Sequence, residues 1–253
     1  MALSGDQIDR YARHLVLKEI GGAGQARLLK ARVLVVGAGG LGAPVLAYLA
    51  AAGVGHIDLV DPDVVSLSNL QRQILFKTSD VGRPKVECAA ASLAALNPDV
   101  TITPHYQHLD TGNADEFVSG MSFIVDGCDN FETRLAAHAA AYRQKIPYSF
   151  AAVGQFDGHL STFRGFEADQ PCLQCFMPAP PPAGSLTTCE EAGVVGALTG
   201  IIGAMQAMEV IRELAGIGGG LAGRILLYDG LSASLRSIEL PKDPACPLCG
   251  QAT

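Results

Sequence analysis

Positive charge is scarce in this sequence. Its 18 lysines and arginines are outnumbered by 25 aspartates and glutamates, which gives a formal net charge of −7. Proteins that bind nucleic acid non-specifically are normally basic, because lysine and arginine neutralise the phosphates. This composition therefore argues against a general nucleic-acid-binding protein.

The sequence also lacks any segment typical of a secretion signal or a membrane span. Residues 1–20 carry charges throughout and have no apolar core, which argues against a secretory signal. The uncharged run Ala192–Met208 has only 17 residues, whereas a membrane span needs roughly 20 predominantly apolar ones. Its glycines favour a buried helix in which Gly196, Gly200 and Gly203 lie near one face and allow close packing. We therefore expect a cytoplasmic protein that does not enter a membrane.

The 253 residues are 49% hydrophobic and 17% charged, so the chain can bury a substantial core. Strand-like and helix-like segments alternate up to residue 153. The predicted strands are 32–36, 57–61, 101–106, 122–127 and 148–153, and the predicted helices are 41–52, 84–96 and 131–143. Such alternation predicts an α/β fold with a Rossmann-like, doubly wound, mostly parallel sheet.

The pattern changes from residue 154 onward. Residues 158–165 and 224–240 alternate apolar and polar side chains, which favours antiparallel strands added to the parallel sheet. A proline-rich loop, 178–185, separates them. We expect one domain, made of an N-terminal helical arm (1–30), a nucleotide-binding core (31–153) and a C-terminal part with the antiparallel strands (154–253).

The segment VVGAGGLG, residues 35–42, fits the G-x-G-x-x-G fingerprint of a nucleotide site. Gly37 permits a tight turn, Gly39 lets phosphate approach the backbone, and Gly42 allows close packing of the helix, whose first N–H groups face the anion. Asp61 ends the next predicted strand, where an acid binds ribose hydroxyls. A site for NAD and a site for ATP would both contain these residues, so this segment does not distinguish the two nucleotides. The structural alternative is a tight turn that binds no ligand.

A polar segment, SLSNLQRQILF (66–76), follows the ribose acid and contains Arg72, and Lys85 comes soon after it in GRPK. A free triphosphate carries more charge than the pyrophosphate of a dinucleotide, and it needs cationic side chains and a metal ion. Arg72 and Lys85 could supply the cations. The alternative is a solvated loop.

The fourth predicted strand runs into VDGCDNFETR, residues 125–134. Asp126 and Asp129 therefore lie at a carboxyl strand end, where open α/β sheets bind ligands. Hard carboxylate oxygen suits Mg²⁺, which makes Asp129 a candidate magnesium ligand. Equally, Asp129 could cap the helix that begins near Phe131. We expect Asp126 to be structural.

Four of the seven cysteines form two C-x-x-C pairs, Cys172 with Cys175 and Cys246 with Cys249. Two such pairs are typical of a tetrahedral zinc site, and a redox pair is the rival interpretation. Because four thiolates leave no open coordination position, the predicted zinc is structural and ties the C-terminus to the body of the chain.

Of the remaining cysteines, Cys88 and Cys128 are expected to be ordinary buried residues. Cys189, near the proline-rich loop, is a candidate nucleophile. The acids beside it, Glu190 and Glu191, would raise the pKa of its thiol and so disfavour the reactive thiolate.

Together these motifs resemble the adenylyltransferases that activate ubiquitin-like sulfur-carrier proteins: the molybdopterin-synthase adenylyltransferase (MoeB) and its thiamine-pathway relative (ThiF). Ubiquitin-activating enzymes share the same core. The motifs run in order along the chain: RYARHL (10–15), VVGAGGLG (35–42), DPDVVSLSNLQRQ (61–73), GRPK (82–85), DGCDN (126–130), the two C-x-x-C pairs and TCEEAGVVG (188–196).

The resemblance implies that the nucleotide is ATP. It implies that Gly40 contacts the nucleotide, that Asp61 binds the ribose, and that Lys85 binds the phosphates. It makes Asp129 the magnesium ligand, with Asn130 beside it. It places five consecutive residues along the ATP: Ser68, Asn69, Leu70, Gln71 and Arg72.

The resemblance also implies a homodimer in which Arg13 reaches the phosphates of the partner subunit's site; from the residues alone, Arg13 is an arginine on an amphipathic helix. The implied reaction is attack by the C-terminal Gly-Gly carboxylate of a carrier protein on the α-phosphorus of ATP. It gives an acyl-adenylate and pyrophosphate without a protein nucleophile. We therefore expect Cys189→Ala to retain pyrophosphate exchange.

The expected carrier is the small subunit of molybdopterin synthase, because TCEEAG resembles that branch, although GVVG and LYDG also suit the thiamine branch. No rhodanese-like segment follows residue 253, so we expect a separate protein to donate the sulfur. An NAD-dependent oxidoreductase would leave SNLQRQ and the cysteine pairs unexplained. A non-catalytic module that binds ubiquitin-like tails would not need Arg72, Lys85 and Asp129.

Overall fold

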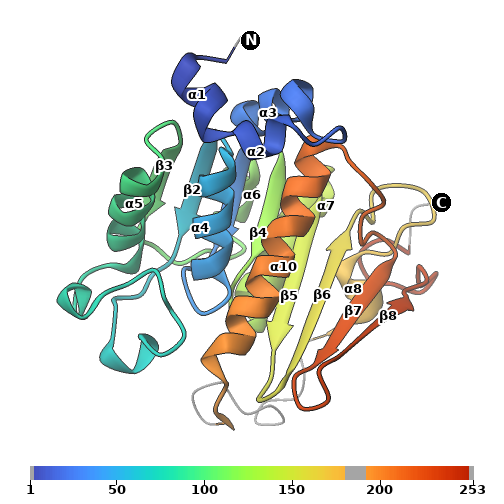
Figure 1. Cartoon of the computed structure of the whole chain (residues 1–253). Coiled ribbons are helices and arrows are strands. Elements are labelled where there is room, and N and C mark those ends of the chain that lie inside the picture. Colours follow the sequence, from blue (N-terminus) through green and yellow to red (C-terminus); the bar gives the residue numbers. More distant parts are fainter. Residues whose placement is uncertain (1–2, 180–191, 251–253) are drawn as a thin grey trace.

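Short runs rich in branched apolar residues form three neighbouring strands of the parallel part of the sheet, at residues 32–36, 56–60 and 123–126. The computed structural model describes residues 3–179 and 192–250. Within them, eight strands form one sheet in the order β3-β2-β1-β4-β5-β6-β7-β8 (Figure 1). The first five pair in parallel: β1 (Arg32–Val36), β2 (His56–Val60), β3 (Thr101–His105), β4 (Phe123–Asp126) and β5 (Tyr148–Val153).

Three antiparallel strands extend this sheet beyond β5. They are β6 (Asp157–Phe163), β7 (Arg224–Asp229) and β8 (Ser234–Glu239). Every residue of β8 is exposed, whereas four of the five residues of β1 are buried. The predicted fold class, a mostly parallel sheet continued by antiparallel strands, is confirmed, and the five predicted parallel strands lie within a residue or two of their expected bounds. The division of the chain into one domain with three parts stays a prediction.

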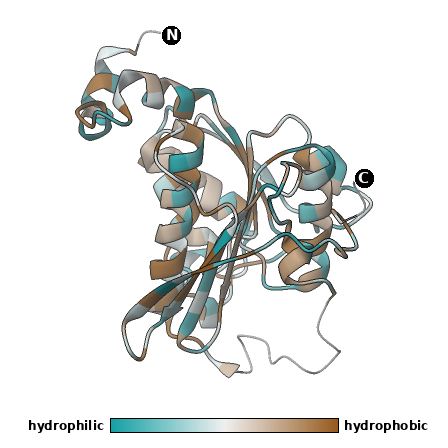
Figure 2. Cartoon of the chain, turned by 90° about the vertical axis from the view of Figure 1, so that its right-hand side faces the viewer, coloured by the Kyte–Doolittle hydropathy of each residue, from teal (hydrophilic) through white to brown (hydrophobic). Residues whose placement is uncertain are grey.

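Successive residues of the central strand β1 contribute to two different cores. Val33 and Val35 belong to a cluster with α4 (Gly42–Ala52), α5 (Lys85–Leu96) and α10 (Gly196–Ala215). Leu34 and Val36 belong to a second cluster with α6 (Ala114–Val118) and α7 (Phe131–Arg143). Side chains alternate between the faces of a strand, so helices on both faces bury the whole run. Figure 2 shows the two helical layers on either side of the sheet.

Several shorter helices lie before β1 and after β6. The predicted N-terminal arm contains α1 (Gly5–Arg10), α2 (Ala12–Leu15) and α3 (Gly21–Lys30). Near the other end, α8 (Leu173–Phe176) precedes the segment that the structure does not describe. Two 3₁₀ turns, η1 (Leu67–Asn69) and η2 (Thr78–Asp80), lie between β2 and α5. Their short, aperiodic sequences give no signal that would have predicted them.

Helix α10 confirms the prediction of a buried, closely packed helix, with one correction. A Cβ on Gly196 would overlap the backbone oxygen of Gln71, and one on Gly203 would overlap Pro44 of α4. Gly200 is different, because no described atom other than its chain neighbours and the backbone of its own helix lies within 4 Å of where its Cβ would be. The prediction that Gly200 allows close packing is therefore wrong. Within the described ranges, no helix combines the length and apolarity that crossing a membrane requires.

Gly200 and Gly203 of α10 give a matched test of this packing. Gly203→Ala is expected to lower the free energy of unfolding by about 1–3 kcal/mol, because the added methyl meets Pro44 and the oxygen of Leu41. Gly200→Ala is expected to raise it by up to about 1 kcal/mol, the difference in helix propensity. Urea denaturation of both variants measures the difference. Equal shifts would contradict the packing described here.

Candidate active site

The glycine loop lies between β1 and α4 and is closed against a second loop that follows β4. Gly37 has φ +94°, and a Cβ there would lie 2.8 Å from the backbone oxygen of Gly127. Gly42 is equally constrained, since its Cβ would overlap the oxygen of Gly37. Backbone hydrogen bonds of 2.8 Å join Gly37 N–H to Val60 and Gly127 N–H to Val36. The ends of β1, β2 and β4 are thus held together at one edge of the sheet.

Asp61 follows β2 and anchors this glycine loop. Its Oδ2 accepts a hydrogen bond of 2.7 Å from the N–H of Ala38, and its Oδ1 accepts one of 2.8 Å from the N–H of Asp63. The residue is 5% exposed, and burial raises the pKa of its carboxyl, while the nearby charge of Lys85 lowers it. The sequence predicted a ribose contact for Asp61 but not this backbone anchor.

Lys85 is the first residue of α5 and faces the same edge. Its Nζ lies 2.7 Å from Oδ2 of Asp63, whose side chain is 61% exposed. The lysine itself is buried. Exposed partners hold an ion pair weakly, so the lysine has a charge that an anionic ligand can share.

The segment Ser68–Arg72 passes over this edge beside the first turn of α10. The guanidinium of Arg72 donates to the backbone oxygen of Ser68 at 3.1 Å. Thr199 of α10 lies against Gly40. Its hydroxyl donates to the oxygen of Gly196 at 2.7 Å and also lies 3.5 Å from the oxygen of Arg72. Asn69 is buried, Gln71 is exposed, and Leu70 packs against the core.

Sequence reasoning missed two residues here. Thr199 joins the glycine loop to the polar segment, although it is distant from both along the chain. Gln73, the last residue of SNLQRQ, is 4% exposed and lies beside Gly39, and its Oε1 has no hydrogen-bond partner among the described residues. Its place in the motif was the one available signal, and nothing in the motif distinguishes it from an exposed glutamine.

The loop after β4 shows which of the two predicted roles, helix cap or magnesium ligand, is compatible with the position of Asp129. Asn130, not Asp129, caps α7, because its Oδ1 accepts a 2.9 Å hydrogen bond from the N–H of Thr133. Asp129 is exposed, and it forms no hydrogen bond or ion pair in the part of the chain that the structure describes. Asp126, in contrast, is fully buried and paired with Arg134. The carboxylate of Asp129 is therefore available to a ligand, and hard oxygen of this kind fits Mg²⁺.

Helix α2, which carries Arg13, lies at the other end of the molecule from this edge (Figure 1). Arg13 is exposed on α2, and its neighbour His14 hydrogen-bonds Gln25 of α3, which in turn donates to the oxygen of Ala52 at the end of α4. Helix α3 also reaches the last residue of α10, since Arg27 donates to the oxygen of Ala215. Helix α10 has 20 residues, so at 1.5 Å per residue it separates its two ends by about 30 Å. Arg13 cannot reach the glycine loop of its own chain.

The four predicted zinc ligands converge at one point. Their sulfur atoms all lie within 4.8 Å of one another, with 3.5 Å between Cys172 and Cys246 and 3.4 Å between Cys175 and Cys249. A tetrahedral zinc with bonds of about 2.3 Å separates its sulfurs by about 3.8 Å. The arrangement therefore fits such a metal, although α8 and the C-terminal segment that supply the ligands are distant in sequence.

Without a metal, the clustered thiols shift one another's pKa values in both directions. Burial acts to raise the pKa of Cys246, but backbone hydrogen bonds from Cys249 and Leu248 lower it below its usual value. Burial and hydrogen bonds with the neighbouring sulfurs raise the pKa of the Cys172 thiol, and burial with the same kind of contact raises the pKa of Cys249 to about 11. A cation that binds here must displace protons, as metals do at thiol sites. Cys88 and Cys128 are buried as expected, and Cys189 lies outside the described residues.

A family comparison matches nearly all of the chain. The model of the ThiF family matches residues 11–248. The chain belongs to the ThiF family. A sulfur carrier protein adenylyltransferase of Thermus thermophilus is 44% identical over 253 residues, which cover 99% of this chain and 93% of that protein. The SAMP-activating enzyme E1 of Haloferax volcanii is 43% identical over 251 residues, which cover 99% and 92% of the two chains.

Solved structures add a likeness in fold to this ThiF-family assignment. The crystal structure of E. coli MccB with MccA-N7isoASN superposes with a TM-score of 0.85 at 21% identity, covering 98% of this chain and 76% of that one. At this identity the likeness concerns the fold alone. The resemblance drawn from the motifs is confirmed by the family match, and with it the class of enzyme, an adenylyltransferase.

The neighbours Asp129 and Asn130 allow a test of their different roles. Asn130→Ala is expected to lower the free energy of unfolding by about 1 kcal/mol, because α7 loses its cap. Asp129→Ala is expected to change it by less than about 0.5 kcal/mol, as for other exposed residues without partners. Thermal denaturation of both proteins makes the comparison. A destabilised Asp129→Ala with an unaffected Asn130→Ala would reverse the assignment.

Proposed function

We propose that this ThiF-family enzyme transfers the adenylyl group of ATP to the C-terminal Gly-Gly carboxylate of a ubiquitin-like sulfur-carrier protein and releases pyrophosphate. The observation that carries the proposal is the convergence of the glycine loop, Asp61, Lys85 and Asp129 at one sheet edge. The names of the two relatives above support the class of substrate. The small subunit of molybdopterin synthase is the carrier we propose first.

Each group has a part in binding ATP. The backbone N–H groups of Gly39, Gly40 and the first turn of α4 face the phosphates, as at other helix N-termini. Asp61, whose two oxygens already accept backbone hydrogen bonds, has lone pairs left for the ribose hydroxyls. Arg72 and Lys85 supply positive charge beside the phosphates, along the segment that begins with Ser68, Asn69, Leu70 and Gln71. Asp129 would hold Mg²⁺, which neutralises phosphate charge when it is bound.

The reaction needs positioning more than acid–base chemistry. The carrier carboxylate, already ionised at neutral pH, attacks the α-phosphorus, and the bond from that phosphorus to the bridging oxygen of pyrophosphate breaks. The products are an acyl-adenylate and pyrophosphate, so no protein nucleophile is consumed. The side chains act by aligning the two substrates and by stabilising the charge that develops on the leaving group.

ATP–pyrophosphate exchange tests this function. The purified enzyme is expected to exchange labelled pyrophosphate into ATP only when a carrier with a free Gly-Gly terminus is present, and the molybdopterin and thiamine carriers are compared side by side. A carrier that lacks its terminal glycine is the negative control. Exchange with the thiamine carrier alone would correct the proposed substrate, and exchange with neither would overturn the function.

Arg72 and Lys85 are expected to matter to the rate rather than to the fold. Arg72→Ala and Lys85→Ala should each slow exchange by about 10²–10³, the typical cost of one lost charge-stabilising contact. Arg83→Ala is the matched control, because Arg83 belongs to the same segment and, among the residues that the structure describes, forms an ion pair only with Asp80. Circular dichroism verifies that each variant is folded. Near-normal exchange in the first two variants would refute their assignment.

We also propose that Cys172, Cys175, Cys246 and Cys249 hold one structural zinc per chain. The prediction is that Cys172→Ser loses the metal and unfolds at a lower temperature, whereas Cys88→Ser, at a buried cysteine outside the cluster, keeps it. Metal analysis by mass spectrometry and thermal denaturation provide the measurements. Wild-type protein purified without chelator that contains no zinc would count against the site.

Finally, we propose that Arg13 serves the site of a partner subunit in a homodimer. The distance along α10 excludes its own site, and the segment that begins at the N-terminus projects beyond the body of the chain (Figure 2). A sulfur donor, which we propose to be a separate protein, would act on the acyl-adenylate after this enzyme.

Mixing two inactive variants tests the role of Arg13 in trans. Arg13→Ala mixed with Lys85→Ala is expected to recover about a quarter of wild-type exchange, since half of randomly paired dimers are mixed and each has one complete site of two. Arg72→Ala mixed with Lys85→Ala is the control, because no pairing of these chains restores a site. Equal results from the two mixtures, with mixed dimers verified by native mass spectrometry, would refute the arrangement.

A further inference from the structure

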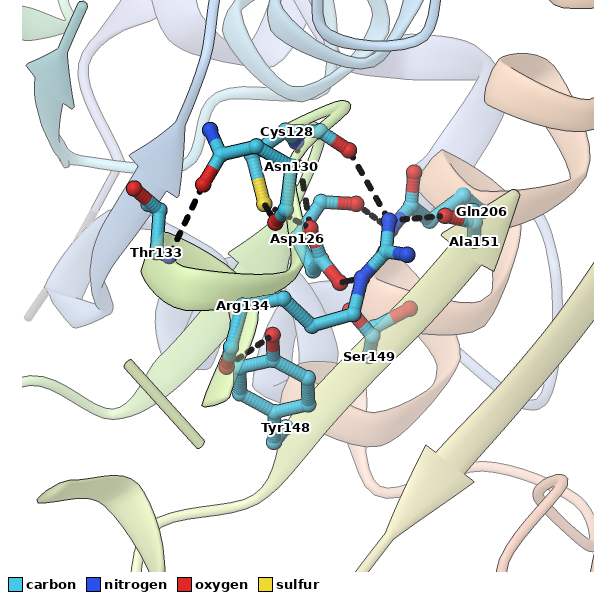
Figure 3. A network of polar contacts seen from close by, with 9 residues as sticks. All are labelled: Asp126, Cys128, Asn130, Thr133, Arg134, Tyr148, Ser149, Ala151 and Gln206. Carbon is cyan, nitrogen blue, oxygen red and sulfur yellow. Dashed lines mark hydrogen bonds and ion pairs between the residues drawn. The ribbon is translucent and has the colours of Figure 1, made fainter. Parts of the chain in front are cut away.

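A buried ion pair lies directly beneath the loop that carries Asp129. Arg134 of α7 donates from Nε to Oδ2 of Asp126 at 2.6 Å (Figure 3). The arginine is 5% exposed and the aspartate 0%. The two charges neutralise each other away from solvent, and a buried pair of this kind is costly to break by removing one partner.

The Nη2 group of Arg134 binds the backbone on both sides of the pair. It donates to the oxygen of Cys128 at 2.8 Å and to the oxygen of Ala151 on β5 at 3.2 Å. Phe150 lies under the guanidinium, with 4.9 Å between the guanidinium carbon and the ring centroid. The planar fork of arginine makes all of these contacts at once, which the single ammonium group of lysine cannot do.

The loop is held from its own side as well. The N–H and the Sγ of Cys128 both donate to Oδ1 of Asp126, at 3.1 and 2.8 Å. From α10, the amide of Gln206 donates to the backbone oxygen of Asp126 at 2.9 Å. Residues 126–128 are thus fixed through their side chains, N–H groups and oxygens, and Asp129 is the next residue along the chain.

This fixed backbone is also the one that meets the glycine loop. The oxygen of Gly127 lies where a side chain on Gly37 would have to fit, so the two loops keep one separation. The distance from the glycine loop, where we propose that the phosphates of ATP bind, to the carboxylate of Asp129 therefore depends on how firmly residues 126–128 are held.

We propose that Arg134 is a positioning residue for Mg²⁺·ATP: its guanidinium, by bridging Asp126, Cys128 and Ala151, sets Asp129 at the distance from the glycine loop that metal-bound nucleotide requires. The proposal rests on the proposed function, in that it takes Asp129 as the magnesium ligand. It assigns to Arg134 no contact with ATP, metal or carrier.

Arg134→Lys tests the proposal without leaving Asp126 unpaired. Affinity for ATP is measured by calorimetry over a series of Mg²⁺ concentrations, with no carrier present. The expected result is that the half-saturating Mg²⁺ concentration rises about 10–100-fold, the usual cost of losing a group that orients a metal ligand. ATP binding without metal should stay at the wild-type value.

Arg164→Lys is the matched control. Arg164 also bonds two acids, Glu167 and Glu213, but it lies after β6, toward the end of α10 that is remote from the glycine loop. Its substitution is expected to lower the unfolding temperature without moving the Mg²⁺ curve. A destabilised Arg134→Lys with a wild-type Mg²⁺ curve would reduce Arg134 to a structural residue and overturn the proposal.

A second variant covers the case in which Arg134→Lys does not fold. The double substitution Asp126→Asn with Arg134→Gln buries no charge and removes the guanidinium, so the same rise in half-saturating Mg²⁺ is expected. A folded double variant with a wild-type curve would refute the proposal, as would wild-type ATP binding that is independent of Mg²⁺. The binding assay contains no carrier. Failure of carrier adenylylation would therefore overturn the proposed function, whereas the proposal for Arg134 depends only on the Mg²⁺ dependence of ATP binding.

Discussion

The close approach of two backbones, at Gly37 and Gly127, is the constraint on which the site depends. A glycine with positive φ is required at Gly37 because any Cβ would collide with the oxygen of Gly127. This contact brings the ends of β1 and β4 into one surface, and the hydrogen bond from Gly37 to Val60 adds the end of β2. Asp61 and Asp129 extend from that surface, so the two carboxylates that we propose for the ribose and the metal inherit their separation from the sheet register.

Helix α10 closes this surface with residues from the last quarter of the chain. Gly196 and Gly203 permit the helix to lie against the polar segment and α4, where larger residues would overlap backbone or proline atoms. Thr199 then lies against the glycine loop, and Gln206 donates to the loop that follows β4. The helix has a structural role in the core and a polar role at the site, and both depend on its distance from its neighbours.

The cysteine cluster serves a different part of the same sheet. Cys172 precedes α8, and Cys246 and Cys249 follow β8, whose residues are all exposed. An exposed edge strand buries little apolar surface and contributes little to its own stability. The convergence of four thiols supplies a local attachment that does not depend on hydrophobic burial, which is the situation in which structural metals are used.

The sequence by itself predicted the fold class, which the structure confirms, and the chemistry of the main site residues, which stays a prediction. Period-two and continuous apolar runs predicted the sheet. The glycine spacing, the acid at the end of the next strand and the two C-x-x-C pairs predicted a nucleotide loop and a tetrahedral metal site, because each of these motifs can be recognised within a short stretch of the sequence. Arg72, Lys85 and Asp129 could be proposed because they follow predicted strands. Only the tertiary structure decided that Asn130 rather than Asp129 caps α7, that Gly200 packs against nothing described, and that Arg13 lies a helix length from its own glycine loop. It alone placed Thr199 beside Gly40, and Arg134 beneath the loop of Asp129. These relations join segments that are separated in the chain or depend on the direction of a side chain, and they are set by packing, which no local pattern of residues specifies.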